Sequence, residues 1–411
     1  MSFLKKTGRK PAKPRLTVAN WAGPEGLVIE RSILGAFLES HPDVDVHVDS
    51  IPKNYQQKIL ATFAANSSPD VFLVDSIDLA AYLEAGALLD LSPYCQLYSV
   101  DLSVFWPEAV TSFIRNDAIY GLPKDMTPLV LYYNIDLLEK AHIDVPLETW
   151  TWDAFRKACL ALTQDKDADG RTDQYGTLSA WEFWCWHPWI WSAGGDILGP
   201  EGKRATGFLD GPQTLSALQF LLNLDKVDGV AAPTEVRESL GGDVGAFLSG
   251  RIATAVGGHW WMTQLKTKME DGSMRVGIAP VPVPLGGKPT TVLYASAWGV
   301  SSQSEYPQLA AELAITLSSI EADKKRTEQG IAIPAHRKLA EQLARDDPTG
   351  LEQTFLDLLP TARKPWGIRV PLMEKVKKRA EEGFVRALFQ DRSLEKEMRS
   401  AAEDIDDLLS P

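Results

Sequence analysis

The first 75 residues alternate between strand-like and helix-like segments, and this order restricts the fold more than any other feature of the chain. The β-rich run LTVAN (16–20) precedes a segment with apolar residues at helical spacing (24–42). The alternating run 44–52, the helical segment 54–66 and the strand-like PDVFLVD (69–75) follow. A β-α-β-α-β order predicts an α/β fold, in which helices cover both faces of a mostly parallel sheet.

The length of the chain predicts two lobes. Single hydrophobic cores stop growing at about 250–300 residues, and this chain has 411. The Gly and Pro of IYGLP (119–123) interrupt the pattern just before the apolar strand LVLYYN (129–134), so we place the first crossing between lobes there. No run of about 18 apolar residues, as a membrane-spanning helix requires, occurs in the sequence.

The charge of the chain excludes one class of partner. Its net charge is −13, whereas sequence-independent binding to nucleic-acid phosphates depends on a clustered excess of Lys and Arg. The basic clusters at 324–326 and 375–379 lie beside acids in helical contexts, and we interpret them as solvated faces. Cys95, Cys159 and Cys185 match no metal or disulfide pattern, so we expect three buried small side chains.

The N-terminal segment bears on the compartment. Residues 1–15 hold six cations and no anion, as the first part of a secretory signal does, but no apolar segment follows before residue 16. We interpret this segment as a basic flexible tail. Either the protein is cytoplasmic, or a natural signal has been removed or replaced.

A series of short motifs runs along the chain in a fixed order and resembles one known family. The motifs, among them IYGLPKDMTPLVLYYNIDLLEKAHID (119–144), are similar to those of the solute-binding proteins of ATP-driven sugar importers, the maltose-binding-like group. The likeness extends from Leu16 to about Leu339. The other segments that carry it are 69–94, 149–155, 243–261, 275–286, 294–305 and 330–338.

This resemblance implies a two-lobed periplasmic-binding-protein fold, similar to class II, with a ligand cleft between the lobes. It assigns residues 16–125 and 274–330 to an N-terminal lobe, and residues 126–273 and 331–411 to a C-terminal lobe. It also implies a protein that binds a mono- or oligosaccharide without chemistry and delivers it to the permease subunits of an ABC importer. We expect a monomer in the periplasm or, as a lipoprotein, on the cell surface.

The segment WEFWCWHPWIW (181–191) contains five of the thirteen tryptophans. A short helix is expected from about Pro188, so Trp181 and Trp184 fall on the turn between strand and helix. In α/β folds such turns face the ligand, and a flat indole matches the C–H face of a sugar ring. We predict that Trp181 and Trp184 contact the ligand, that Trp189 and Trp191 pack in the core, and that Trp186 does one or the other.

Other polar and aromatic residues occupy turns where the resemblance and the topology place a cleft. Glu25 and Asp75 are candidates that equally suit the capping of a helix, and Lys124 and Asp125 either contact the ligand or pair with each other. Trp260 is preferred to Trp261. The complete set of predicted ligand contacts is Trp21, Glu25, Asp75, Lys124, Asp125, Trp181, Trp184, Trp186, Trp260, Trp261, Trp298 and Arg337.

The loop DKDADGRTDQYG (165–176) has half of a calcium-binding signature. Its acids Asp165, Asp167, Asp169 and Asp173 stand at positions 1, 3, 5 and 9, with Gly at position 6. Position 12 is Gly176, where a bidentate Glu is expected. Two interpretations stay open, a structural calcium site outside the cleft and a solvated acidic turn. No other cofactor is expected.

Two alternative functions compete with transport. A carbohydrate-active enzyme also combines aromatic plates with paired carboxylates, and Glu25, Asp75 and Asp125 are the acids available for it. An intracellular sugar-sensing protein needs the same kind of cleft. The sequence contains no G-x-S-x-G elbow, no H-E-x-x-H and no phosphate-binding glycine loop, so binding without chemistry is the function we predict.

Overall fold

The structure, a computed structural model, describes residues 13–145, 149–328, 330 and 332–410, without the side chains of residues 24 and 25. It begins with the alternation that the sequence predicts. Strands β2, β1 and β3 lie side by side in that order and run parallel. The five elements are β1 (Arg15–Asn20), α1 (Pro24–Ser40), β2 (Asp45–Ser50), α2 (Tyr55–Ala64) and β3 (Val71–Asp75).

Both faces of this sheet are covered, as predicted. Val71 and Leu73 of β3 belong to one buried cluster, and Phe72 and Val74 belong to another. Since successive side chains of a strand point to opposite faces, each face of the sheet has its own core. The first cluster includes residues of α1 and of α13 (Pro307–Leu317), which pack against each other.

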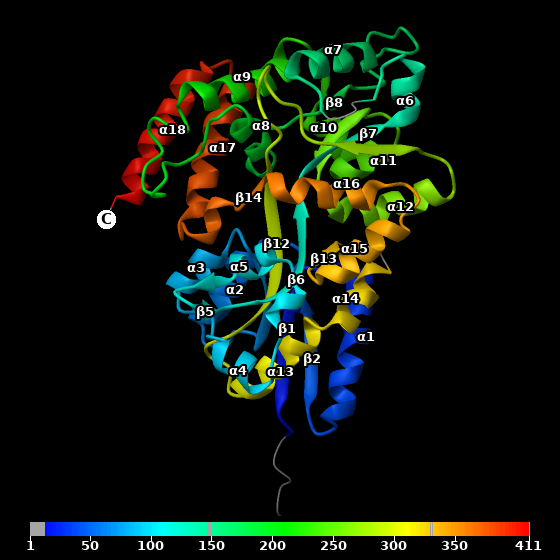
Figure 1. Ribbon diagram of the computed structural model, residues 1–411. Helices are drawn as coiled ribbons and strands as arrows, with labels where there is room; N and C mark the ends of the chain where they lie inside the picture. The colour runs from blue at the N-terminus through cyan, green and yellow to red at the C-terminus, as the bar shows by residue number, and fades with distance from the viewer. Residues whose placement is uncertain (1–12, 146–148, 329, 331, 411) are drawn as a thin grey trace, which may run out of the picture.

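The rest of the first sheet comes from distant parts of the chain. The long strand β12 (Thr291–Val300) lies antiparallel between β3 and β6 (Leu122–Pro128). Strand β13 (Ile333–Pro334) extends the sheet beyond β6, and β14 (Ala362–Arg363) pairs with the start of β12. In Figure 1, β6 and β12 run lengthwise between the two halves of the molecule.

The second lobe is built around a smaller antiparallel sheet. Its order is β10 (Thr254–Gly257), β7 (Val130–Asn134) and β11 (Val276–Ala279). A parallel pair, β8 (Thr177–Leu178) and β9 (Ala231–Ala232), lies beside it. The helices of this lobe include α6 (Ile135–Lys140), α7 (Trp152–Leu162), α8 (His187–Ser192), α9 (Pro212–Lys226), α10 (Thr234–Ser239), α11 (Gly242–Leu248), α12 (Met262–Glu270), α17 (Met373–Phe389) and α18 (Leu394–Leu409).

Short elements complete the chain. In the part that the structure describes, no helix combines the length and the apolar character needed to cross a bilayer. The remaining elements are α3 (Leu79–Glu84), α4 (Ser92–Leu97), α5 (Pro107–Ser112), β4 (Ile114–Arg115), β5 (Ala118–Ile119), α14 (Ile320–Thr327), α15 (Arg337–Asp346), α16 (Leu351–Leu358) and the 3₁₀ turns η1 (Leu102–Val104), η2 (Phe183–Cys185), η3 (His259–Trp261), η4 (Leu359–Thr361) and η5 (Trp366–Ile368).

The chain passes from the first sheet to the second at Leu129, between β6 and β7. Leu129 is fully buried, and its backbone N–H and C=O both bond to the Thr291 hydroxyl at the start of β12, at 3.1 and 2.8 Å. The sequence predicts the boundary after residue 125, whereas β6 stays in the first sheet to Pro128, so the crossing lies slightly later than predicted. The Thr291 hydroxyl satisfies backbone groups that lie between the two sheets and would otherwise be unpaired.

Two strand pairings shift the predicted lobe boundaries. Strand β11 falls within the segment 274–330 that was assigned to the N-terminal lobe, yet it pairs with β7 of the second sheet. Strand β13 falls within 331–411, assigned to the C-terminal lobe, yet it pairs with β6 of the first sheet. The apolar pattern of a short strand does not show which sheet it joins, because that depends on its partner.

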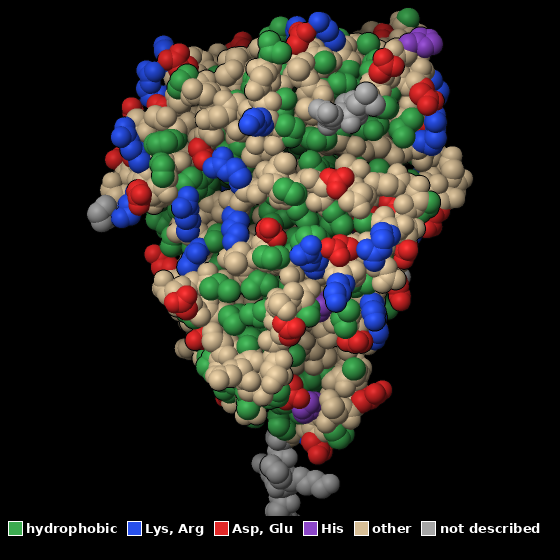
Figure 2. Space-filling model, viewed as in Figure 1, with side chains coloured by type: hydrophobic (Ala, Val, Ile, Leu, Met, Phe, Trp, Pro, Cys, Tyr) green, Lys and Arg blue, Asp and Glu red, His purple; other side chains and the backbone are tan. Residues whose placement is uncertain are grey.

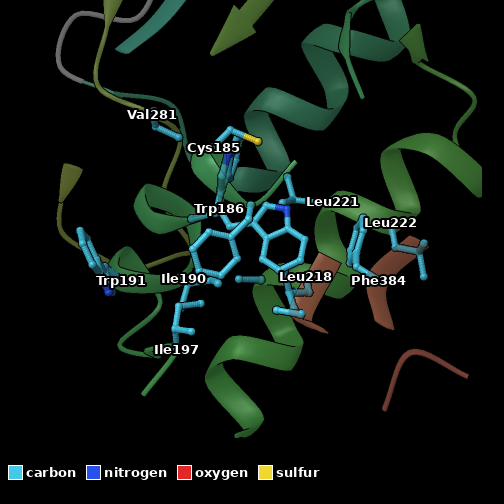
Figure 3. Packing of buried hydrophobic residues seen from close by; sticks show 14 of the residues in the cluster. Cys185, Trp186, Ile190, Trp191, Ile197, Leu218, Leu221, Leu222, Val281 and Phe384 are labelled. Atoms are coloured by element: carbon cyan, nitrogen blue, oxygen red, sulfur yellow. The ribbon is translucent and has the colours of Figure 1, made fainter. Parts of the chain in front are cut away.

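The core of the second lobe is rich in indole. Figure 3 shows Trp186 and Trp191 with Leu218, Leu221 and Phe384. Trp186 is fully buried, and its ring lies 5.1 Å from that of Phe384 on α17. Helix α8 then ends before Gly194, whose positive φ of 80° suits the end of a helix.

Trp189 and Trp191 are buried as predicted, with exposures of 2% and 5%. The Trp189 ring lies 5.7 Å from the rings of Phe155 on α7 and Phe220 on α9. We expect Trp189→Ala to lower the free energy of unfolding by about 3–5 kcal/mol, because the variant loses buried contacts and leaves a cavity. Urea unfolding measures the change. Trp260→Ala is the control, since Trp260 is 40% exposed, and an equal loss in both variants would contradict the assignment.

Candidate functional site

A cavity of about 600 Å³ opens at the junction between the two sheets. It receives side chains from the end of β3, from β6 and β12, and from the loops and turns of the second lobe. Open α/β sheets bind ligands at such junctions. The residues that line the cavity are Trp21, Asp75, Ile77, Lys124, Asp125, Thr127, Glu182, Trp184, Asp243, Trp260, Tyr294, Ala295, Ser296 and Ala332.

Three tryptophan side chains supply flat apolar surface from both lobes. Trp21 follows β1 of the first sheet, and its ring is edge-on to Tyr55 at 5.1 Å. Trp184 and Trp260 belong to turns of the second lobe and meet edge to face at 5.9 Å and 67°. The Tyr294 hydroxyl on β12 donates to the Trp184 carbonyl at 2.8 Å, which ties this turn to the first sheet.

An ion pair and a serine occupy the floor of the cavity. Ser296 on β12 lies opposite Asp125 on one neighbouring strand and opposite Asp75 on the other. The Lys124 ammonium donates to Asp125, and so does the Ser296 hydroxyl. Lys124 and Asp125 thus pair with each other, which confirms that interpretation, and they also line the cavity, where their contact with a ligand stays a prediction.

A second group of charges lies beside the edge of the Trp184 indole. One Arg237 nitrogen lies 2.9 Å from the Glu182 carboxylate and 3.2 Å from that of Asp243. The Trp184 indole N–H donates to Glu182 at 3.3 Å. Burial raises the pKa of Asp243, although the nearby Arg237 opposes that shift. The three charged groups hold one another in place and fix the edge of the Trp184 ring.

Asp75 has weaker partners than the other carboxylates of the cavity. Its Oδ1 accepts from the Ile77 backbone N–H at 3.1 Å and from the Ser76 hydroxyl at 3.4 Å. Burial raises the pKa of Asp75 to about 6, and the negative charges of Asp125 and Glu374 add to the shift. Among the residues that the structure describes, this partly buried carboxylate therefore makes no ion pair with a cation.

The structure brings half of the predicted ligand contacts together in this cavity. These are Trp21, Asp75, Lys124, Asp125, Trp184 and Trp260. Glu25 lies in α1, and its side chain is outside the described part of the structure.

Three predicted tryptophans require correction, because they are core residues. Trp186 and Trp298 are 0% exposed and Trp261 is 1% exposed. Trp261 stacks on Tyr132 at 5.0 Å, and Trp298 lies beneath the Arg326 guanidinium at 5.7 Å. A side chain with no exposed surface cannot touch a ligand in this cavity.

Trp181 and Arg337 lie outside this cavity, so contact of either residue with a ligand stays a prediction. Trp181 is not among the residues that line the cavity, and its ring faces the Arg237 guanidinium at 5.5 Å. Arg337 is exposed at the start of α15, where it pairs with Glu341 at 2.8 Å and lies over the Trp106 ring. Both cation contacts come from residues too far along the chain to be read from local sequence.

The sequence prediction missed eight residues of the cavity, and for several of them a signal existed. Glu182 stands inside the tryptophan-rich segment, and Asp243 and Tyr294 begin motifs that carry the family resemblance. The prediction selected the tryptophans of these segments instead. The missed residues are Ile77, Thr127, Glu182, Asp243, Tyr294, Ala295, Ser296 and Ala332.

The acidic loop brings part of its predicted ligand set together. Carboxylate oxygens of Asp165, Asp167 and Asp173 all lie within 4.8 Å of one another, while Asp169 is outside this group. The Gly170 N–H donates to Asp165 at 2.9 Å. Three oxygen donors on one loop suit a hard cation such as calcium, and calcium binding here stays a prediction.

The comparison with known proteins gives a family match and related structures. Residues 23–324 match the family described as bacterial extracellular solute-binding protein. A probable ABC transporter-binding protein of Deinococcus radiodurans is 26% identical over 67% of this chain and 63% of its own length. The arabinooligosaccharide-binding protein of Bacillus subtilis is 25% identical over 70% of this chain and 65% of its own length. The chain thus spans slightly less than two thirds of both relatives.

Solved structures share the fold over nearly the whole chain. An ABC substrate-binding protein from Listeria monocytogenes, in complex with cycloalternan, superposes with a TM-score of 0.85 at 23% identity, over 97% of this chain and 99% of its own. A solute-binding protein from Thermotoga lettingae, bound with alpha-D-tagatose, gives 0.83 at 22% identity, over 97% and 100%. These similarities confirm the two-lobed α/β fold.

The raised pKa of Asp75 predicts a pH-dependent difference in stability. Its ordinary pKa is 3.8 and its folded pKa is about 6, so the folded state binds this proton more tightly. The stability that it contributes is present below about pH 4 and is lost as the pH rises through about 6. We expect Asp75→Asn to gain stability relative to the unchanged protein between about pH 5 and pH 7.5.

Urea unfolding without ligand measures this difference. Asp153→Asn is the control, because the Asp153 side chain is 70% exposed and pairs with Lys157 on the same helix. A difference between Asp75→Asn and the unchanged protein that is the same at both pH values would contradict the assignment.

The acidic loop gives a separate prediction. We expect about 1 mM calcium to raise the melting temperature, because a ligand that binds only the folded state stabilises it. In Asp165→Asn the increase should shrink, since one of the three clustered carboxylates is lost. Equal melting temperatures in calcium and in chelator would leave the loop as a solvated turn.

Proposed function

Because the chain belongs to the bacterial extracellular solute-binding protein family, we propose that it binds a carbohydrate in the cavity between its lobes. The names of several relatives support this ligand class, among them the arabinooligosaccharide-binding and galactooligosaccharide-binding proteins of Bacillus subtilis. We further propose that it delivers the carbohydrate to the permease subunits of an ABC importer.

The observation that carries the proposal is the pairing of flat aromatic rings with charged hydrogen-bonding groups in one cavity. A pyranose has patches of C–H on its faces and hydroxyls around its edge. Trp21, Trp184 and Trp260 offer apolar faces, while Asp75 and Asp125 offer carboxylates at cavity depth. Buried sugar hydroxyls need partners, and hydrogen bonds to charged groups contribute on the order of 1.5–3 kcal/mol.

The distribution of these groups over two lobes suits closure around the ligand. Trp21 belongs to the first lobe, and Trp184 and Trp260 belong to the second. The chain passes between the sheets at Leu129, and again between β11 and β12. Rotation at these crossings would bring the indoles onto opposite faces of one sugar ring.

Binding without chemistry is the proposed mode of action. The Asp125 and Glu182 carboxylates are engaged by Lys124 and Arg237, which favours fixed acceptors over groups that exchange protons. A carbohydrate-active enzyme is the alternative, and it would release reducing ends from an oligosaccharide. We propose an extracytoplasmic location because the family is extracellular. An intracellular sensor is distinguished by where the native protein is found.

Figure 2 bears on the class of ligand. It shows acidic and basic side chains interspersed over the visible face of the molecule, with basic side chains also present around its middle. With a net charge of −13, this distribution does not favour nucleic acid as a partner.

The proposal is tested with a saccharide panel and one variant. A thermal-shift screen should identify a stabilising sugar, and titration calorimetry then gives its Kd. We expect Trp184→Ala to weaken binding by about 1–3 kcal/mol, by analogy with aromatic stacking on other ring ligands, which is roughly 5- to 150-fold in Kd. Its free energy of unfolding should change less than that of Trp189→Ala.

The matched control is Trp152→Ala. Trp152 stacks on Phe220 at 4.8 Å and is not among the residues that line the cavity, so the affinity of this variant should be unchanged. Normal sugar binding by Trp184→Ala would remove the indole from the proposed site, and the absence of any stabilising saccharide would contradict the ligand class.

A further inference from the structure

The charges that line the cavity are unbalanced. Four carboxylates line it, from Asp75, Asp125, Glu182 and Asp243, whereas Lys124 is the sole Lys or Arg among the described lining residues. Lys124 is already paired with Asp125, and Arg237 behind the wall serves both Glu182 and Asp243. Within the described chain, this leaves Asp75 without a basic partner.

The surroundings of Asp75 add negative charge. Asp78, at the start of α3, has an exposure of 8%, and its carboxylate makes no hydrogen bond or ion pair with any residue that the structure describes. Burial raises the pKa of Asp78, and the charges of Asp75 and Glu374 raise it further. The positive charge of Lys377 opposes the rise in the pKa of Asp78, but Lys377 lies 3.6 Å from Glu374 and pairs with it.

Asp75 and Asp125 also face the cavity at the same level of the sheet. They lie on the two strands that flank β12, each directly opposite Ser296. The Ser296 hydroxyl and the Lys124 ammonium both donate to Asp125. From the described residues, Asp75 receives one backbone N–H and one long hydroxyl contact. A positively charged group in the cavity would find its acceptor at Asp75.

The aromatic lining is compatible with a cation. Indole faces attract positive charge as well as sugar C–H groups. A negatively charged ligand would meet four carboxylates and a single cation that is already paired.

The geometry points to a saccharide that carries a protonated amine, with Asp75 as the residue that pairs with the amine. This inference rests on the proposed function, because it specifies the chemical class of the sugar that the cavity takes. A neutral sugar would use Asp75 only as an acceptor of hydroxyl groups, whereas an amino sugar would also neutralise the carboxylate. N-acetylation removes that positive charge, and a uronic acid reverses it.

The test compares sugars that differ in one substituent. The neutral sugars are glucose, galactose, mannose and the β-1,4-linked disaccharide of glucose. Each is titrated beside its 2-amino counterpart and its N-acetylated 2-amino counterpart, at pH 7 and low salt. Glucuronate is the anionic probe. We expect at least one 2-amino sugar to bind about tenfold or more tightly than its hydroxyl parent, and glucuronate to bind most weakly.

Variants assign the preference to Asp75. In Asp75→Asn, the amino sugar and its parent should bind within about threefold of each other, because the charge is lost while an acceptor oxygen remains. Asp153→Asn, far along the chain and 70% exposed, should keep the full preference. A preference that persists in Asp75→Asn would overturn the assignment to this residue.

The outcomes separate this inference from the function on which it rests. Neutral sugars that bind as tightly as their amino counterparts, or more tightly, would overturn the amino-sugar inference and leave carbohydrate binding intact. A failure of every sugar, charged and neutral, to bind would overturn both.

Discussion

The first passage of the chain between the two sheets depends on one fully buried residue. Leu129 has no neighbouring strand of its own, and the Thr291 hydroxyl serves both its N–H and its C=O. Because Thr291 starts β12, the longest strand of the first sheet, the passage of the chain is attached to the element that also forms the cavity floor. A backbone satisfied by one side chain permits the sheets to meet without a continuous ladder between them.

The carboxylates on the two sides of the cavity differ in how they are paired. On the second-lobe side the Arg237 guanidinium pairs with both Glu182 and Asp243, so that wall is preformed and can hold an indole edge in a fixed orientation. Asp75 on the first-lobe side is left with weak partners. A partly buried carboxylate without a cation destabilises the unliganded protein, and such a conflict with stability is typical of a binding site.

Much of the fold could be predicted, because its signals are local. The alternating segments up to Asp75 show the parallel unit, and the break before the LVLYYN strand shows the first crossing. The sheets to which β11 and β13 belong could not be predicted in this way, since the residues of a short strand do not indicate which strand it pairs with. The predicted boundaries moved for that reason.

The candidate site was less predictable, because its residues too depend on partners that are distant in the sequence. Trp184 and Trp186 share one short turn, but Trp186 turns toward Phe384, about 200 positions along the chain. The place of Glu182 depends on Arg237, on another helix. Such long-range contacts decide which residue of a local cluster reaches the cavity. The sequence therefore predicted that tryptophans and carboxylates line the cavity, but not which of them do so.

The division of the indoles has a spectroscopic consequence. Trp186, Trp189, Trp261 and Trp298 are almost completely removed from solvent, whereas Trp260 is 40% exposed and Trp21 and Trp184 line the cavity. The fluorescence of the buried group should be insensitive to a water-soluble quencher and should form a steady background. The emission that a quencher does reach comes from the partly exposed indoles, and Trp21, Trp184 and Trp260 among them line the cavity. The part of the quenching that a bound ligand removes therefore reports whether that space is filled.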